Sequence, residues 1–242
     1  MSKKINKAEI YKAYGIEYKG GKINTPLGWL PELLRNGNTK TGAAVKTWAM
    51  STSTCAVQCA KCYGRTGFYA FGNGLEMLKR NATIARDYPE FFRNALFAQL
   101  ATFKDGTEIR IHVVGDFFSE QYKDTWHNAA EMYPALIFWT YTKTKYESAF
   151  DDLDNANIVK SLINGEFNFG HCDHVMKLYN NLTEAGESVH ICRCGVDDDQ
   201  HCAGCHKCSI SKYVLFLEHS TEYKAKEDPL FPVLAEMIEA QA

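Results

Sequence analysis

The cysteines are the residues of this chain whose spacing most clearly predicts chemistry. Cys55, Cys59 and Cys62 form a C-x3-C-x2-C pattern on one short loop. Three thiolates at this spacing can bind three irons of a [4Fe–4S] cluster and leave the fourth iron open, whereas a four-cysteine site is saturated. Closed structural zinc sites take four ligands, so three cysteines alone favour an open cluster over zinc. The open iron can receive a substrate, a cofactor or another protein ligand.

A second group of cysteines lies towards the C-terminal end of the sequence. Its members are Cys192, Cys194, Cys202, Cys205 and Cys208. The last three form a C-x2-C-x2-C run, which is typical of bacterial ferredoxin loops that need one further cysteine from outside the run. Cys192 or Cys194 can supply that ligand, so we expect an auxiliary cluster here.

Two alternatives remain open for the second group. Zinc is one of them, because paired cysteines with histidines close in sequence also form structural zinc sites. A single shared cluster is the other, with Cys172 or a cysteine of the second group filling the open iron of the first.

The distribution of the cysteines favours metal binding in a reducing compartment. The chain of 242 residues has nine cysteines, and only Cys172 lies outside the two groups. No apolar run is long enough to span a membrane, and the basic first residues lack the apolar core of a signal peptide, so we expect a cytoplasmic protein. Disulfides are disfavoured there. The net charge of −2 gives no strong signal for nucleic-acid or membrane binding.

Strands and helices alternate along the segments that must position these cysteines. An alternating run at 45–50 directly precedes the first cysteine loop and predicts a strand. Further strands are expected at 108–114, 136–142, 158–163, 188–192 and 213–217. Helices are expected at 75–88, 89–103, 120–133, 145–153, 173–185 and 227–241.

This alternation is typical of parallel β/α units. Six such units without a glycine-rich dinucleotide fingerprint predict an α/β fold, built as a partial (β/α)6 TIM-like barrel. We divide the chain into an N-terminal cap at 1–44, a barrel core with the cluster loop at 45–187, and a segment at 188–242. That last segment holds the final strands, the cysteine-rich insertion and a C-terminal helix. The cluster should lie at the C-terminal mouth of the barrel, on loops that follow strands.

Two other sets of side chains have more than one interpretation. His112, on an expected strand, is either a hydrogen-bonded core histidine or a contact inside the barrel. Tyr63, Phe68, Tyr69 and Phe71 are expected to cover the cluster and exclude water. They could instead stack on nucleic acid, but no basic residues are interleaved with them.

The cysteine loop after a first strand, at the head of a β/α series, resembles the radical S-adenosylmethionine (SAM) superfamily. This resemblance implies a [4Fe–4S] cluster bound by Cys55, Cys59 and Cys62. It also implies a SAM molecule on the open iron, whose reductive cleavage yields a 5′-deoxyadenosyl radical. A reductant such as flavodoxin or ferredoxin is then a candidate partner.

The resemblance also implies which residues contact SAM. Gly115 and Asp116 stand where the family has a glycine-rich segment that contacts the amino group of SAM. Lys61 occupies a position that is usually aromatic in the family, and Tyr63 is the candidate to replace that aromatic ring. The Gly-Gly-Glu pattern of the family is absent.

Several segments resemble a bacteriophage gene-product family. These are the two cysteine groups and residues 36–40, 112–119 and 138–143. The similarity covers most of the chain from residue 33 to residue 208. It implies a viral origin, hence the host cytoplasm, and a radical-SAM-like barrel, and it carries no established reaction.

The leading hypothesis is therefore an iron–sulfur protein with radical-SAM chemistry on a small-molecule or macromolecular substrate that the sequence does not identify. The catalytic residues stay unassigned. One alternative is a non-catalytic redox or structural [4Fe–4S] protein that does not bind SAM. Another is a zinc-stabilised binding module.

Overall fold

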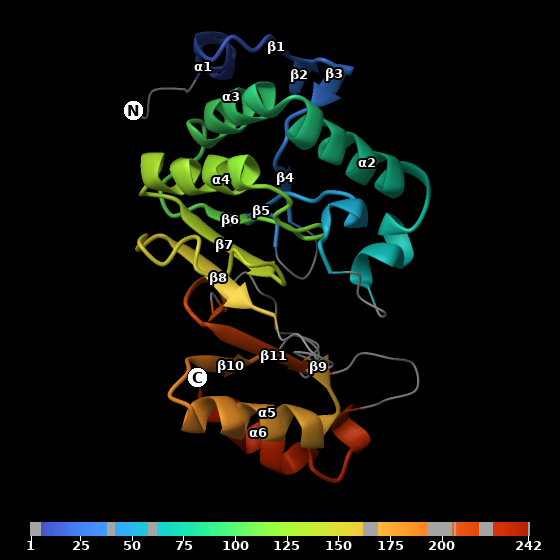
Figure 1. The fold of residues 1–242 in the computed structure, drawn as a ribbon, viewed down its shortest axis with the longest axis vertical. Coiled ribbons are helices and arrows are strands. Elements are labelled where there is room, and N and C mark those ends of the chain that lie inside the picture. Colours follow the sequence, from blue (N-terminus) through green and yellow to red (C-terminus); the bar gives the residue numbers. More distant parts are fainter. Residues whose placement is uncertain are drawn as a thin grey trace.

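The N-terminal segment forms a small cap on the rest of the chain. The computed structural model describes residues 6–37, 42–57, 62–161, 169–192, 205, 207–217 and 225–241. Helix α1 (Lys7–Ala13) precedes an antiparallel sheet of β1 (Tyr18–Lys19), β2 (Lys22–Thr25) and β3 (Gly28–Pro31). This cap lies over helix α3 at one end of the molecule (Figure 1). Leu33 and Leu34 are buried in the main core, so the end of this segment packs against the rest of the chain.

A five-stranded central sheet carries the first cysteine loop. Its strands, in spatial order, are β4 (Arg35–Asn36), β5 (Lys46–Thr47), β6 (Glu108–Arg110), β7 (Ile137–Thr142) and β8 (Ala156–Lys160). Strand β4 is antiparallel to β5, and the other neighbours are parallel. Helices α2 (Gly72–Asp87), α3 (Pro89–Leu100) and α4 (Glu120–Met132) cover one face of this sheet (Figure 1).

Local sequence signals explain where these helices begin. Pro89 occupies the first turn of α3, where its missing N–H leaves no hydrogen bond unmade. The Ser119 hydroxyl accepts a hydrogen bond from the backbone N–H of Tyr122 and caps α4. Apolar side chains of α3 and α4, such as Leu96 and Trp126, then pack with Phe138 of β7 in the largest hydrophobic core.

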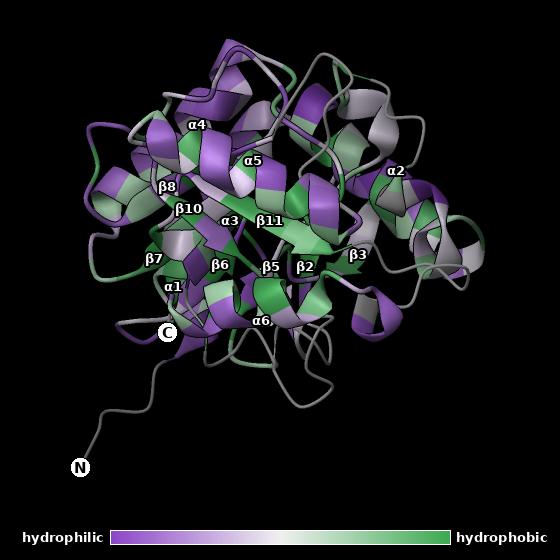
Figure 2. Cartoon of the chain, turned by 90° about the horizontal axis from the view of Figure 1, so that it is seen from below, coloured by the Kyte–Doolittle hydropathy of each residue, from purple (hydrophilic) through white to green (hydrophobic). Residues whose placement is uncertain are grey.

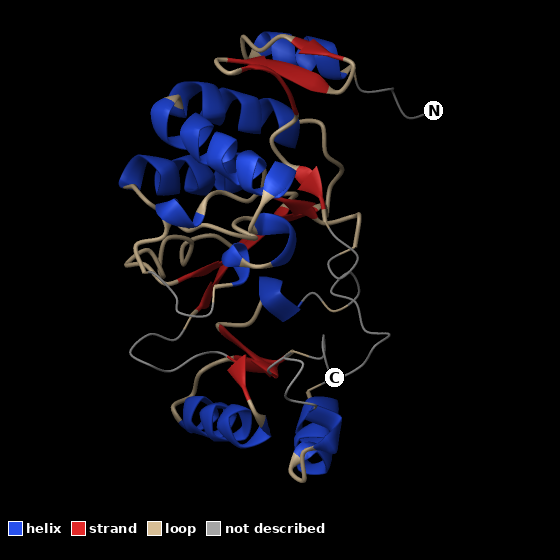
Figure 3. Cartoon of the chain, turned by 90° about the vertical axis from the view of Figure 1, so that its right-hand side faces the viewer, coloured by secondary structure: helices blue, strands red, loops and turns tan. Residues whose placement is uncertain are grey.

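A second, three-stranded parallel sheet follows in the chain. Its order is β10 (Val189–Ile191), β11 (Tyr213–Leu217) and β9 (Phe169–Gly170). Helices α5 (Cys172–Glu184) and α6 (Phe231–Glu239) cover its outer face, so both sheets lie between two layers of helices (Figure 3). Figure 2 shows the strands coloured as hydrophobic, with helices of alternating hydropathy around them. Short 3-10 helices complete the fold: η1 (Thr52–Thr54), η2 (Tyr63–Arg65), η3 (Gly67–Tyr69), η5 (Lys207–Ser209) and η6 (Ala225–Glu227).

The two sheets meet through β8 and β11. The backbone N–H of Lys160 donates to the carbonyl of Lys212 at 2.8 Å. Val159 of β8 and Val214 of β11 pack with Cys192 in one small apolar cluster. The face of the central sheet opposite α2–α4 is therefore covered by the second sheet and by η5, which contacts β7 and β8.

The predicted helices at 75–88, 89–103, 120–133 and 173–185 are confirmed as α2, α3, α4 and α5, and the strand predictions are confirmed in part. The predicted helix at 145–153 is wrong, because this segment forms successive turns. Side-chain oxygens there compete with helical hydrogen bonding: Thr142 Oγ1 accepts from the N–H of Thr144, and Thr144 Oγ1 accepts from the N–H of Tyr146. The C-terminal helix begins at Phe231, after a turn in which the Asp228 carboxylate accepts from the N–H of Leu230.

Strand β6 is shorter than the expected strand at 108–114. It ends at Arg110, and His112 has a φ of 60°, a left-handed conformation that breaks a strand. The described strands form three separate sheets and close no barrel, so the partial barrel and its division at residues 44 and 187 stay predictions.

His112 belongs to a chain of buried polar groups in the main core. Its Nδ1 lies 3.2 Å from Thr140 Oγ1, and its Nε2 lies 3.0 Å from the Tyr122 hydroxyl. That hydroxyl also accepts from the indole N–H of Trp48 at 2.9 Å. His112 is only 3% exposed, and burial lowers its pKa from 6.5 to about 3. These contacts fit the interpretation of His112 as a hydrogen-bonded core histidine, and His112 also lies in the wall of the cavity described below.

We predict an acid sensitivity that depends on His112. The unfolded chain binds a proton at this residue below pH 6.5, while the folded protein does so only near pH 3. The free energy of unfolding should therefore fall as the pH drops through this window, by about 1.4 kcal/mol per pH unit from this residue. Asparagine tolerates a positive φ but does not titrate. Urea unfolding measures the difference in free energy of unfolding between the native chain and His112→Asn. This difference should favour the native chain less at pH 5 than at pH 7, and an equal difference at both pH values would contradict this account.

Candidate metal and ligand site

A cavity of about 300 Å³ lies at the C-terminal ends of the central strands. One wall is the first cysteine loop, with Cys55 and Cys62. A second wall is formed by residues at or just after the ends of the parallel strands: Arg110, Gly115, Asp116, Tyr141, Lys143 and Ser161. Phe216 of β11 closes the remaining side. Loops after the ends of parallel strands build the sites of many β/α folds.

Short hydrogen-bonded turns position the two described cysteines of the loop. The N–H of Met50 donates to the carbonyl of Val114 at 2.8 Å, which fixes the chain just before η1. Cys55 ends that turn, and its N–H donates to the Thr52 carbonyl at 3.1 Å. The carbonyl of Cys62 accepts from the N–H of Arg65 at 3.0 Å, so Cys62 directly precedes η2. Cys59, Lys61 and the Tyr63 side chain lie outside the described residues.

Two glycines allow the loop to approach the strand ends. A Cβ at Gly64 would overlap Val114 Cγ1 and would lie 2.9 Å from Thr52 Cγ2. Gly115 has a φ of 94°, and its Cβ would lie 3.0 Å from both Met50 Cβ and Thr54 Oγ1. A larger residue at Gly64 would therefore require Val114, Thr52 or the loop that carries Cys62 to shift.

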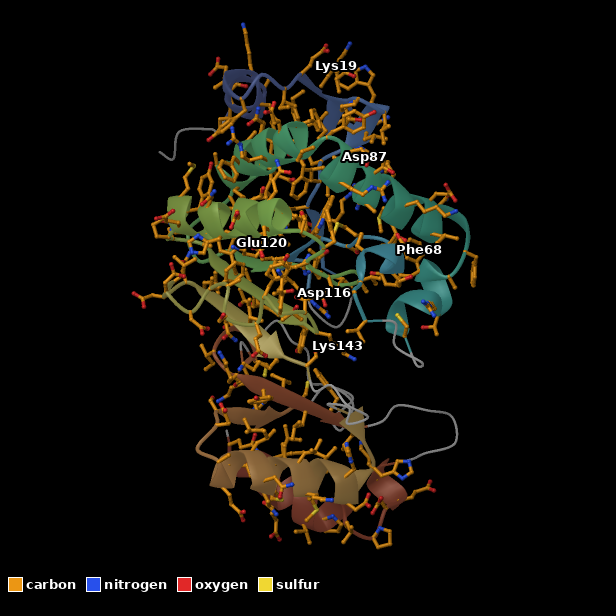
Figure 4. The ribbon with its side chains drawn as sticks, viewed as in Figure 1. Lys19, Phe68, Asp87, Asp116, Glu120 and Lys143 are labelled. Atoms are coloured by element: carbon orange, nitrogen blue, oxygen red, sulfur yellow. The ribbon has the colours of Figure 1, made fainter. Side chains whose placement is uncertain are left out.

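Asp116 holds the other side of the cavity in place. Its Oδ1 accepts from the N–H of Phe117 at 2.8 Å and from Thr142 Oγ1 at 2.7 Å. Its Oδ2 accepts from the N–H of Lys143 at 2.9 Å. Figure 4 shows Asp116 and Lys143 near one another at this end of the sheet. Burial raises the pKa of the carboxyl, and these hydrogen bonds oppose that rise by stabilising the charged form.

The described part of the second cysteine group reaches the same region from the opposite sheet. The Cys208 thiol lies 3.0 Å from the Tyr141 hydroxyl, and Tyr141 lines the cavity. Burial and the neighbouring Cys208 raise the pKa of Tyr141 well above its ordinary value. The Cys205 thiol lies 4.0 Å from His190 Nε2. Tyr141 therefore links the described part of the second group to the wall of the cavity.

Other predicted ligands are placed elsewhere or are not described. Cys172 begins α5 and is fully buried in the core of the second sheet, away from the residues that line the cavity. Cys194 and Cys202 lie outside the described residues. Within the described ranges, no three His, Cys, Asp or Glu side chains converge as a metal site.

Sequence reasoning missed several residues of the cavity wall. Arg110, Tyr141, Lys143 and Ser161 all lie at or next to the ends of β6, β7 and β8. The Arg110 guanidinium carbon lies 5.2 Å from the centre of the Trp139 ring and 5.7 Å from that of Tyr141. The rule that strand ends carry the site could have found these residues, because the strands themselves were recognised.

Comparison with known proteins gives one family. A family model described as Gene product 88 matches residues 2–228 of the chain. No curated protein and no solved structure matches the chain. None of the described helices is both long enough and apolar enough to cross a membrane.

We predict that Gly64→Ala destabilises the loop through a clash with Val114. Overpacking of this kind costs about 1–3 kcal/mol, measured as a lower free energy of unfolding in urea. Val114→Ala removes the opposing methyl groups, so the double variant should be more stable than the sum of the two single effects predicts. Additive effects of the two substitutions would show that a clash with Val114 is not the cause of the destabilisation.

Proposed function

Because the chain belongs to the Gene product 88 family, whose description states no reaction, we propose its function from the cavity. The protein binds one [4Fe–4S] cluster through Cys55, Cys59 and Cys62 and holds a SAM-type ligand beside it. The observation that carries this proposal is that Cys55, Cys62, Gly115 and Asp116 line the same cavity. These residues are far apart in the sequence, and the spacing and the family resemblance identified them independently of the fold.

The side chains of the cavity suit such a cluster. Cys55 and Cys62 are partly exposed thiols rather than disulfides. Arg110 and Lys143 line the same cavity, and nearby cations favour the thiolate form that binds metal. A [4Fe–4S] cluster with an open iron supplies electrons and a coordination position for a ligand.

Asp116 can orient the ligand. A carboxylate offers about four acceptor positions, and three are used by Phe117, Thr142 and Lys143. The fourth, on Oδ2, is available to accept a hydrogen bond from a ligand ammonium group. The volume of about 300 Å³ is at the lower end of the range for small-molecule sites. We therefore propose radical-SAM-type chemistry on a substrate of unassigned class.

A zinc ion is a second candidate, for the second cysteine group alone. Cys205 and His190 approach within 4.0 Å, and mixed cysteine and histidine ligands are typical of structural zinc. Tyr141 lies between Cys208 and the cavity, which favours two separate sites over one shared cluster.

We expect protein purified without oxygen to be brown and to lose one cluster's worth of iron on substitution of the first loop. Cys55→Ala and Cys62→Ala each remove a ligand, so iron bound per chain should fall by about four atoms. Cys172→Ala is the matched control, because this buried thiol lies in the core of the second sheet, and it should leave iron unchanged. Metal analysis and absorbance are the measurements.

Two outcomes would count against this assignment. Colourless native protein with stoichiometric zinc would show that both cysteine groups bind zinc and not iron. Iron content that is unchanged in folded Cys55→Ala and Cys62→Ala variants would show that the cluster is not bound by the first loop.

We further expect SAM to bind the cluster-loaded protein through Asp116. Removing a hydrogen bond to a charged group costs about 1.5–3 kcal/mol, so Asp116→Asn should weaken SAM binding by about tenfold to a hundredfold. Methylthioadenosine lacks the amino acid moiety, so its affinity should change little between the two proteins. Equilibrium titration measures binding, and the paramagnetic resonance spectrum of the reduced cluster should change when SAM is added.

An intact cluster whose spectrum does not respond to SAM would favour the alternative of a non-catalytic redox or structural iron–sulfur protein. Equal losses of affinity for SAM and methylthioadenosine would mean that Asp116 supports the cavity without contacting the ammonium group.

A further inference from the structure

A second cavity, of about 180 Å³, lies beside the first. It is bounded by β4, β5, η3 and the middle of α2, and it shares Arg110 and Val113 with the first cavity. Its polar wall includes Arg35, Asn36, Thr47 and Asn81, and its aromatic wall includes Phe68 and Tyr69. Thr47 and Arg110 are direct neighbours across β5 and β6.

Positive charge gathers at this second cavity. Arg35 and Arg110 line it, and Arg80 adjoins it through a hydrogen bond of 3.3 Å to Asn81 Oδ1. Burial lowers the pKa of Arg80, and the nearby Arg35 lowers it further by charge repulsion. Glu32 lies close enough to oppose the lowering of the Arg35 pKa, but its carboxylate already accepts from Lys7 and Tyr11. Within the described residues, none of the three arginines forms a salt bridge with a carboxylate.

Two of these guanidinium groups have hydrogen-bonding capacity that the described residues do not use. The Nε atoms of Arg80 and Arg110 are buried without a hydrogen-bond partner in the described structure. Buried N–H groups normally have acceptors. Guanidinium groups favour phosphate and carboxylate oxygens, which they bind with paired hydrogen bonds.

The aromatic wall indicates what the anion is attached to. The Phe68 side chain is 63% exposed, and its ring packs edge-on against Tyr69 with the centroids 5.4 Å apart. Exposed rings beside cations are the usual surfaces on which nucleobases stack. A volume of about 180 Å³ is below the usual range for whole small-molecule ligands, so only the anionic part of a ligand fits inside. Figure 4 shows Phe68 on the side of the molecule next to α2.

We propose that this second cavity binds a nucleotide phosphate between Arg35, Arg80 and Arg110, with the base stacked on Phe68. The cations come from β4, α2 and β6, which explains why no basic residues are interleaved with the aromatic residues in the sequence. The ligand is either a free mononucleotide or a nucleotide within single-stranded nucleic acid. This site does not depend on the metal chemistry proposed for the first cavity.

The test compares three probes on the full chain: inorganic phosphate, adenosine 5′-monophosphate and a short fluorescein-labelled single-stranded oligonucleotide. Arg35→Met and Arg80→Met should each weaken nucleotide binding by at least about tenfold, because a charged hydrogen-bond donor is lost. Arg86→Met is the matched control, since Arg86 also lies on α2 but pairs with Asp87 on the surface, and it should leave affinity unchanged. Phe68→Ala should weaken the monophosphate by about tenfold and leave inorganic phosphate unaffected.

The two sources of the ligand are distinguished by the relative affinities. Much tighter binding of the oligonucleotide than of the monophosphate identifies nucleic acid, and comparable binding identifies a mononucleotide. The proposal is overturned if neither the monophosphate nor the oligonucleotide binds the native chain. It is also overturned if Arg86→Met weakens binding as much as Arg35→Met does, or if Phe68→Ala has no effect. Loss of the cluster in the Cys55→Ala variant should not abolish nucleotide binding, because none of the described cluster ligands lines this cavity, so failure of the first proposal is distinguishable from failure of this one.

Discussion

The carboxylate of Asp116 is the contact on which the rim of the first cavity depends. The chain that follows β6 keeps backbone hydrogen bonds to Trp139, Trp48 and Met50 as far as Val114. Beyond that point, Asp116 joins the loop to the end of β7 by accepting hydrogen bonds from Phe117, Thr142 and Lys143. A buried carboxylate without these partners would carry a large desolvation cost. The same interactions that make its burial tolerable therefore hold Gly115 against Met50 and Thr54, and they keep the strand ends opposite the cysteine loop.

Much of this architecture follows from local patterns in the sequence. The sequence predicted α2, α3, α4 and α5, and the structure places Pro89 and Ser119 at the starts of α3 and α4, where these residue types are favoured. The turns at 145–153 were missed because Thr142 and Thr144 bond to nearby backbone N–H groups, a choice that apolar spacing does not reveal. The strand expected at 108–114 was too long because His112 adopts a left-handed backbone conformation, which apolar spacing also does not reveal.

The site was predictable where chemistry depends on spacing and unpredictable where it depends on tertiary contact. Cysteine spacing identified Cys55 and Cys62, and the resemblance to the radical SAM superfamily identified Gly115 and Asp116, all of which line one cavity. Tyr141 and Phe216 come from different sheets and approach only because β8 and β11 are neighbours. The grouping of Arg35, Arg80 and Arg110 likewise depends on strand order. No single-sequence pattern encodes that order directly.

Arg110 borders both cavities, and it carries only one positive charge. A negatively charged ligand in either cavity would accept hydrogen bonds from the guanidinium group of Arg110. Fewer of these donors would then remain for a ligand in the other cavity. Such sharing is a coupling free energy, and thermodynamics requires that it act equally in both directions. Occupants of like charge would then bind with negative cooperativity, while a cationic ligand in one cavity would release Arg110 to the other. Through Arg110, the affinity of each cavity for its ligand would therefore depend on the charge of the ligand bound in the other cavity.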